Sequence, residues 1–195
     1  MRFALVDGER TIAAPKSSGL CPLCKEQVIP KCGRIKIWHW AHKNKEDCDP
    51  WYEPETEWHL RWKEEFPQEW QEVSIGNHRA DVKTPLKVIE FQNSSLSVDK
   101  IEEREQFYGN MVWVLNGETI CTNLHFYGSR HQNRIKFIWK WARKSWFYAK
   151  KPIYIDFGRE ILCVKKGFGG FSGLPISKEI FLKTIGMLGA VEWYK

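Results

Sequence analysis

The stretch NHRADVKTPLKVIEFQNS, residues 77–94, carries the most apolar β-strand signal in the chain. Two runs of strand-forming residues flank a short polar turn, with Asp81 in the first run and Glu90 in the second. Acidic side chains are poor strand formers and poor core residues, so their position here needs a reason. Alternation along a strand puts Glu90 and Gln92 on one face, and we expect Asp81 to be a cross-strand neighbour.

Two carboxylates held close together repel each other unless a cation lies between them. Mg²⁺ takes one or two carboxylates and completes its shell with water and phosphate oxygens. Bound there, it polarises a phosphoryl group and lowers the pKa of its water. We therefore interpret Asp81 and Glu90 as ligands of Mg²⁺ or Mn²⁺ that face a phosphodiester. The alternative is a polar strand edge without chemistry.

The run ETEWHLRWKEEF, residues 55–66, predicts a helix that begins near Pro54. Glu55, His59 and Lys63 recur at i, i+4 and i+8 and form one polar stripe. A third acid from this helix would complete an acidic pocket around the metal. The alternative is a solvated helix face held by pairs of opposite charge.

Cysteine and histidine crowd the first quarter of the chain. CPLC and HWAH each place two ligands two residues apart, at a separation close to that of tetrahedral zinc sites. A strictly extended HWAH would send its histidines to opposite faces, so both bind only if a turn intervenes. The predicted ligands are Cys21, Cys24, His39 and His42, with Cys48 as a substitute for one histidine and Cys32 as a weaker substitute.

Four protein ligands leave zinc no open position, so we expect a structural site. Two alternatives remain. The residues could be buried thiols and histidines of an ordinary small domain, or the cluster could itself be a zinc-dependent hydrolase.

The composition, 43% hydrophobic and 14% aromatic, is typical of a folded protein. A chain of 195 residues is long enough to bury a sizeable core. No apolar run approaches the roughly 20 residues needed to span a bilayer, and MRFALVDGER lacks the apolar region of a signal peptide. We expect a cytoplasmic protein that does not enter a membrane.

The net charge of +6 is concentrated in one segment. Residues 119–155 contain no Asp or Glu and eight Lys or Arg, which suits a polyanionic partner. RIKFIWKWARKSWFYA, residues 134–149, predicts a helix with a basic face that neutralises phosphates and aromatic rings that stack on bases. The alternative is a core helix with a solvated basic face. The candidate phosphate contacts are Arg134, Lys136, Lys140, Arg143 and Lys144.

The order of predicted elements is helix, three strands, helix and strand, which indicates an α/β core. A hairpin, FALVDGERTIAA, and the cysteine-rich segment precede it. A further hairpin and a last helix follow the basic segment. We predict three regions: a hairpin and zinc module over 1–50, a core over 51–117, and a basic α+β region over 118–195.

Several motifs occur together between Cys21 and Asn116. They are CPLC, WHWAH, ETEWH with Lys63, RADV, IEFQNSSLS, a helix with Arg104 and Tyr108, and MVWVLNG. With these motifs the chain resembles the competence-protein CoiA-like family, a branch of the PD-(D/E)xK nuclease superfamily. The resemblance covers about half the chain and implies a zinc-knuckle N-terminus ahead of a restriction-endonuclease-like core.

The resemblance also implies roles for individual residues. Asp81 and Glu90 would be metal ligands, Gln92 would take the usual lysine position, and Glu55 would be the helix acid. His59 would line the site, and Arg104 would lie near the site or the nucleic acid backbone. Ala80 replaces the proline of the superfamily's name, which is a mild departure.

Gln92 in place of lysine is the more serious departure, because an ammonium can stabilise negative charge or help deprotonate water, whereas an amide only orients water. The family itself uses EFQ, so catalysis would fall on metal-bound hydroxide, helped by Lys63 or His59.

We therefore predict a metal-dependent nuclease that hydrolyses phosphodiester bonds of nucleic acid, with DNA favoured, through a metal-activated water. Its cofactors would be structural Zn²⁺ and catalytic Mg²⁺ or Mn²⁺. The alternative is a zinc-stabilised protein without turnover that binds nucleic acid or docks a partner.

Overall fold

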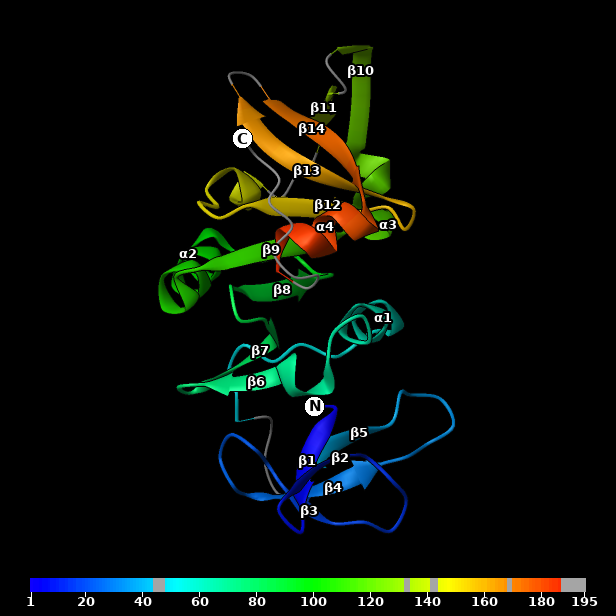
Figure 1. The fold of residues 1–195 in the computed structure, drawn as a ribbon, viewed down its shortest axis with the longest axis vertical. Coiled ribbons are helices and arrows are strands. Elements are labelled where there is room, and N and C mark those ends of the chain that lie inside the picture. The colour runs from blue at the N-terminus through cyan, green and yellow to red at the C-terminus, as the bar shows by residue number, and fades with distance from the viewer. Residues whose placement is uncertain (44–47, 132–133, 141–143, 168–169, 187–195) are drawn as a thin grey trace. The chain divides into compact units, whose positions relative to one another are not determined.

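The computed structural model describes residues 1–43, 48–131, 134–140, 144–167 and 170–186. The chain forms two compact units, Met1–Lys83 and Thr84–Lys195. Both units combine helices with β-strands (Figure 1), so the predicted mixed α/β class is confirmed. None of the helices in the described ranges is long and apolar enough to cross a membrane. The predicted division at residues 50 and 117 stays a prediction.

The first unit contains a five-stranded antiparallel sheet. Asp7 and Gly8 both have positive φ, 50° and 87°, as a two-residue turn of this hairpin type requires, and the predicted hairpin is confirmed. Trp40 and Val28 are buried in the core of this sheet. In spatial order the strands are β2 (Glu9–Ile12), β1 (Phe3–Val6), β3 (Gly19–Leu20), β4 (Gln27–Lys31) and β5 (His39–His42).

A helix and a hairpin complete the first unit. Helix α1 (Glu57–Lys63) has Thr56 as its N-cap, and the capping box is closed by the ring of His59. The helix therefore begins after Glu55, which the sequence had predicted to lie on it. A short 3₁₀ helix, η1 (Gln68–Trp70), leads into the antiparallel strands β6 (Gln71–Ile75) and β7 (His78–Lys83).

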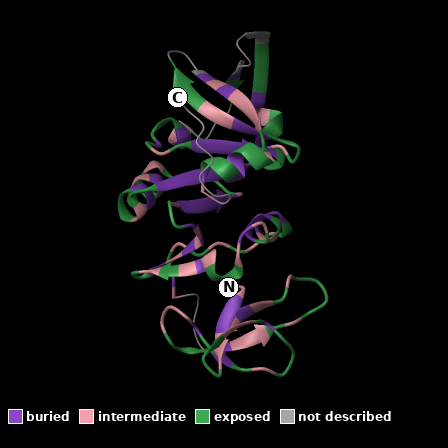
Figure 2. Cartoon of the chain, viewed as in Figure 1, coloured by how far each residue is buried: buried purple, intermediate pink, exposed green. Residues whose placement is uncertain are grey.

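Strands β8 (Val88–Gln92), β9 (Met111–Asn116) and β12 (Ile153–Asp156) run parallel in the second unit. Every residue of these three strands is buried (Figure 2), as expected for parallel strands covered on both faces. Helix α2 (Val98–Tyr108) makes the connection from β8 to β9. Beyond β12 the sheet continues through antiparallel partners in the order β13 (Glu160–Gly167), β14 (Gly170–Ser177), β11 (Arg134–Trp139) and β10 (Leu124–His131).

Short helices connect or end these strands. They are α3 (Gly117–Ile120), η2 (Cys121–Asn123), η3 (Lys144–Phe147) and α4 (Lys178–Thr184).

The predicted helix over residues 134–149 is wrong. Residues 134–139 form β11, and Lys144–Phe147 form the 3₁₀ helix η3. Lys136 and Ile138 are exposed while Phe137 and Trp139 are buried, which is the two-residue period of a strand. Aromatic and β-branched residues pack well on a pleated surface, and β10 and β14 supply the backbone partners.

We expect Gly117→Ala to destabilise the second unit. A Cβ at Gly117 would collide with the carbonyl oxygen of Asp156 and lie 2.8 Å from Cδ1 of Phe157. We expect a loss of about 2 kcal/mol in the free energy of unfolding, measured by urea denaturation. Gly167→Ala is the control, because a Cβ there meets no atom within 4 Å. Equal stability of the two variants would contradict the close approach at Gly117.

Candidate functional site

Four side chains of the first unit converge on one point. The ligand atoms of Cys21, Cys24, His42 and Cys48 all lie within 4.8 Å of one another. The Sγ atoms of Cys21 and Cys48 are 3.7 Å apart, and Cys24 Sγ is 3.2 Å from His42 Nε2. A tetrahedral site with Zn–S bonds of about 2.3 Å separates two sulfurs by about 3.8 Å, so the separations fit one zinc ion.

The turn after β3 brings the first two ligands together. The backbone N–H of Lys25 donates to Cys21 O at 3.0 Å, and Cys21 N–H donates to Glu26 O at 2.8 Å. Lys25 has φ 62°, so the chain reverses immediately after Cys24. His42 is the last residue of β5, opposite Val28 of β4, and its side chain is buried.

The donor set also fits zinc chemically. Burial and the adjacent sulfurs of Cys21 and Cys24 raise the pKa of the Cys48 thiol to about 12. A divalent cation favours the thiolate form, because it replaces repulsion among the sulfurs with attraction. Three sulfurs and one imidazole are typical of a closed structural zinc site, which has no open position for substrate. Zinc held by these residues would tie the β3–β4 turn to the end of β5.

The group found in the structure differs from the predicted set of ligands at one position. Cys21, Cys24 and His42 come from the predicted set, and the substitute Cys48 takes the fourth place. His39 lies outside the group, and its Nδ1 is 2.8 Å from Ile37 O. HWAH is extended as β5, so its two histidines point to opposite faces, as the strand geometry requires.

A buried ion cluster surrounds the end of α1. The Nζ atom of Lys63 is 2.8 Å from Glu55, 3.2 Å from Glu72 and 3.1 Å from Asp81, measured to one carboxylate oxygen of each. The Lys63 side chain is only 5% exposed. Burial would lower the pKa of Lys63, but Asp81, Glu72 and Glu55 together outweigh it and hold that pKa well above its usual value. Lys63 is therefore held as an ammonium cation by its three carboxylate partners.

The sequence did not single out Glu72. Its backbone is left-handed, with φ 45°, which is costly for a residue with a side chain. Its carboxylate accepts the backbone N–H groups of Arg2 at 2.8 Å and Phe3 at 3.4 Å. Burial would raise the pKa of Glu72, but Lys63, the N-terminal ammonium, Arg79 and the backbone N–H of Arg2 together outweigh it, and the pKa falls to about 2. Nothing in QEVSI marks this residue, because its partners are distant in the chain.

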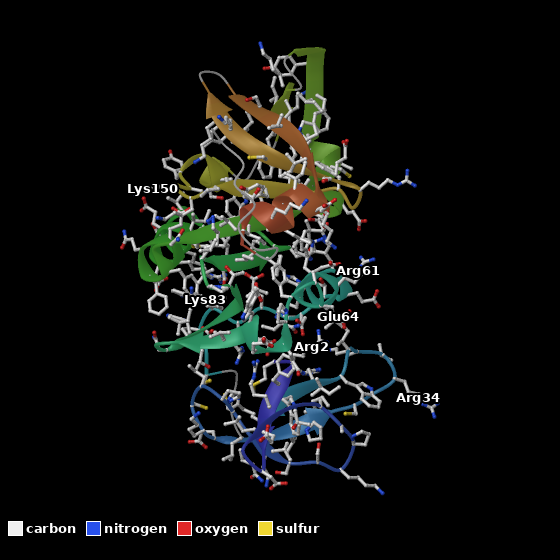
Figure 3. All side chains as sticks on the ribbon, in the orientation of Figure 1. Arg2, Arg34, Arg61, Glu64, Lys83 and Lys150 are labelled. Atoms are coloured by element: carbon white, nitrogen blue, oxygen red, sulfur yellow. The ribbon has the colours of Figure 1, made fainter. Side chains whose placement is uncertain are left out.

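His59 is buried and uses its Nδ1 in the cap of α1. The N–H of Thr56 lies 3.2 Å from this atom, and the Thr56 hydroxyl lies 2.8 Å from it. The solvated helix face offered as an alternative is therefore wrong, since both His59 and Lys63 are buried. A more exposed ion pair joins Arg2 to Glu64 at the end of α1, at 3.1 Å (Figure 3).

In the second unit, Glu90 and Gln92 lie on β8 and are both buried. They pair with Trp113 and Leu115 of β9, so they share one face as predicted. Nη1 of the buried Arg104 lies 3.3 Å from Glu90 Oε2. Gln92 Nε2 donates to Ser94 Oγ at 3.0 Å. The alternative interpretation, a polar strand edge, is therefore wrong for Glu90, because Glu90 is buried.

The predicted phosphate contacts of the basic segment are only partly described. Lys136 and Lys140 are exposed to solvent. Arg143 lies outside the described residues, as do the side chains of Arg134 and Lys144.

The comparisons with known proteins point to the cysteine-rich segment. Residues 9–50 match the model of the competence protein CoiA N-terminal domain. No curated protein matches the chain, and no solved structure does.

The CoiA N-terminal match covers Cys21, Cys24, His42 and Cys48, and thus the whole candidate zinc site. The ion cluster and β8 lie outside the matched residues. The resemblance read from the sequence is supported in this part, and the nuclease superfamily stays a prediction.

Replacing Cys48 should remove zinc, and replacing His39 should not. We expect the purified wild-type protein to contain one equivalent of zinc by elemental analysis, and Cys48→Ser to lose most of it. Melting temperature should fall with it, because a structural metal contributes folding free energy directly. His39→Asn and the exposed Cys121→Ser should retain zinc. Zinc loss in His39→Asn, with retention in Cys48→Ser, would reject the set gathered by the structure.

Glu72 should make stability depend on acid pH. Its pKa is about 2 when folded against an ordinary 4.5. The stabilisation is therefore present above pH 4.5 and is lost as the pH falls through 2. In denaturant titrations between these values, we expect the wild type to lose about 3 kcal/mol that Glu72→Gln does not lose.

The Lys63→Met background tests the cause of this dependence. If Lys63 lowers the pKa of Glu72, then Glu72→Gln should change the pH dependence less in that background than in the wild type, although the N-terminal ammonium and Arg79 remain. An unchanged effect of Glu72→Gln would show that Lys63 is not responsible.

Proposed function

We propose that this protein hydrolyses phosphodiester bonds of nucleic acid, DNA above all, with the help of a divalent metal ion. The observation that carries the proposal is the grouping of the buried Glu72 and the half-buried Glu55 and Asp81 around the buried Lys63. Concentrated carboxylate charge that is buried beside a single lysine is common at functional sites. The competence family matched by residues 9–50 supports DNA as the substrate.

In the proposed mechanism, Asp81 and Glu90 would hold Mg²⁺ or Mn²⁺, as their spacing D-x8-E-x-Q in the sequence suggests. When bound, such an ion polarises the phosphate and lowers the pKa of the attacking water. Gln92 orients the nucleophile through its amide. Lys63, which remains protonated, stabilises negative charge that develops on the phosphate. Glu55 and Glu72 fix the Lys63 ammonium in position.

A second function is favoured by a specific observation. Asp81 has Lys63 as an internal counter-ion, and Glu90 has Arg104. Acids neutralised in this way can be purely structural. The second candidate is therefore a zinc-stabilised protein that binds nucleic acid without cleaving it. It requires no Mg²⁺.

Cleavage assays separate the two functions. Supercoiled plasmid and single-stranded DNA are incubated with the protein in Mg²⁺, Mn²⁺ or EDTA, and the products are resolved on gels. We expect cleavage that needs the metal and falls at least about 100-fold in Asp81→Asn and Glu90→Gln, because the ion contributes several kcal/mol to the transition state. The matched control is Asp99→Asn, whose side chain is exposed at the start of α2.

Melting curves of each variant distinguish lost catalysis from lost folding. Cleavage that survives in EDTA, or in folded Asp81→Asn, would reject the proposed mechanism. An absence of cleavage together with salt-sensitive binding would establish the second function instead.

A further inference from the structure

One face of the outer strands carries an aligned row of polar and aromatic residues. In the strand registers, Tyr127 of β10 lies opposite Lys136 of β11, Lys136 opposite Ser172 of β14, and Ser172 opposite Lys165 of β13. Residues that lie directly opposite each other in a sheet point to the same face. We call these four residues the Tyr127–Lys165 row. Three strand spacings make it about 14 Å long.

The row is open to solvent, whereas the opposite face of these strands carries buried aromatic rings together with the exposed Phe126. Tyr127 is 46% exposed, and Lys136 and Lys165 are exposed as well. On the opposite face Phe137 and Phe171 are buried, with their rings stacked 5.6 Å apart. The open face is therefore not needed for the core of the second unit.

The neighbouring pair extends the same surface. His125 lies opposite Ile138, two residues along from Tyr127 and Lys136, and both are exposed. Two residues from Lys165 along β13, Cys163 lies opposite Leu174 of β14 and Tyr154 of β12. Helix α4 packs against Tyr154 through Phe181, with the ring centroids 4.8 Å apart. Helix α4 thus covers another part of this face.

Among the described residues of β10, β11, β13 and β14, this face carries lysines and no acid. The sequences of β10, β11, β13 and β14 contain one acid, Glu160. Glu160 pairs with Ser177 and lies five residues before Lys165, so it points to the opposite face. Cations without an intervening acid, beside an exposed ring, form a surface that complements a chain of phosphates with accessible bases.

We propose that the Tyr127–Lys165 row binds single-stranded nucleic acid. The proposal rests on the proposed function and names the form of substrate that the protein takes. Lys136 and Lys165 neutralise phosphates, and Tyr127 stacks on an unpaired base. A flat sheet with an upright aromatic ring suits a single strand, because the faces of its bases are accessible, whereas those of a duplex are stacked on one another.

A protein partner is the weaker alternative for this face. Lysine is depleted at the centres of protein interfaces, and two lysines belong to the row. The large apolar side chains that these strands expose on this face are those of Tyr127 and Ile138. Two such side chains do not make the apolar centre that a protein interface usually has.

Binding is measured by fluorescence anisotropy of a labelled oligodeoxythymidylate of about 15 nucleotides, without added Mg²⁺ or Mn²⁺, so that cleavage is not supported and structural zinc is retained. We expect Tyr127→Ala to weaken the Kd about tenfold and Tyr127→Phe to restore it, because stacking needs only the ring. The aromatic control is Tyr148→Ala, whose side chain is 60% exposed on the segment after η3.

The charge test compares two double variants of equal charge. Lys136→Gln with Lys165→Gln should reduce the slope of log K against log salt by about 1.4, which is the loss of two phosphate contacts on a single strand. Lys16→Gln with Lys31→Gln, exposed lysines of the first unit, should leave the slope unchanged. An unlabelled duplex of the same length should compete poorly.

Three results would overturn the proposal: wild-type affinity in Tyr127→Ala, equal effects of the two lysine pairs, or duplex that competes as well as single strand. If Tyr127→Ala changes neither metal-dependent cleavage nor binding, the row is not the binding site, and the proposed function is unaffected. Binding through the row without any cleavage would reject the proposed hydrolysis and leave the row standing.

Discussion

The ammonium of Lys63 is the constraint on which the first unit depends. A buried cation is tolerated only when carboxylates compensate for its lost hydration, and removal of one partner of a buried ion pair typically costs about 3–5 kcal/mol. Glu55 comes from the segment before α1, Glu72 from β6 and Asp81 from β7. Glu72 also accepts the backbone N–H groups of Arg2 and Phe3. One charge therefore holds a helix, a hairpin and the start of β1 together.

The candidate zinc site is also connected to the β6–β7 hairpin, through Asp49. Asp49, next to Cys48, accepts the backbone N–H of Arg79 at 2.8 Å and lies 2.9 Å from Nδ1 of His78. The ring of His78 stacks on Trp51 at 3.3 Å. The segment that supplies the last zinc ligand is thus fixed to β7. Zinc would order the module matched to CoiA, and through Asp49 it would also steady the strand that carries Asp81.

The second unit combines a buried centre with an accessible surface. Strands β8, β9 and β12 are buried throughout, which keeps Glu90 and Arg104 out of water. Farther along the sheet the strands are antiparallel, and such strands can present one face to solvent. The Tyr127–Lys165 row occupies that kind of face. The proposed chemistry and the proposed contact with nucleic acid therefore involve different residues.

Local sequence determined the elements whose signals lie within a few residues: the Asp7–Gly8 hairpin, the strands β7 and β8, helix α2, and the cysteine pair of the knuckle. Tertiary structure decided the rest. Cys48 replaces His39 because β5 stays extended when it pairs with β4. Residues 134–139 form a strand because β10 and β14 provide hydrogen-bond partners. Glu72 belongs to the ion cluster because Arg2 and Lys63 lie against it in the folded chain. The residues next to Glu72 in the sequence do not predict these partners.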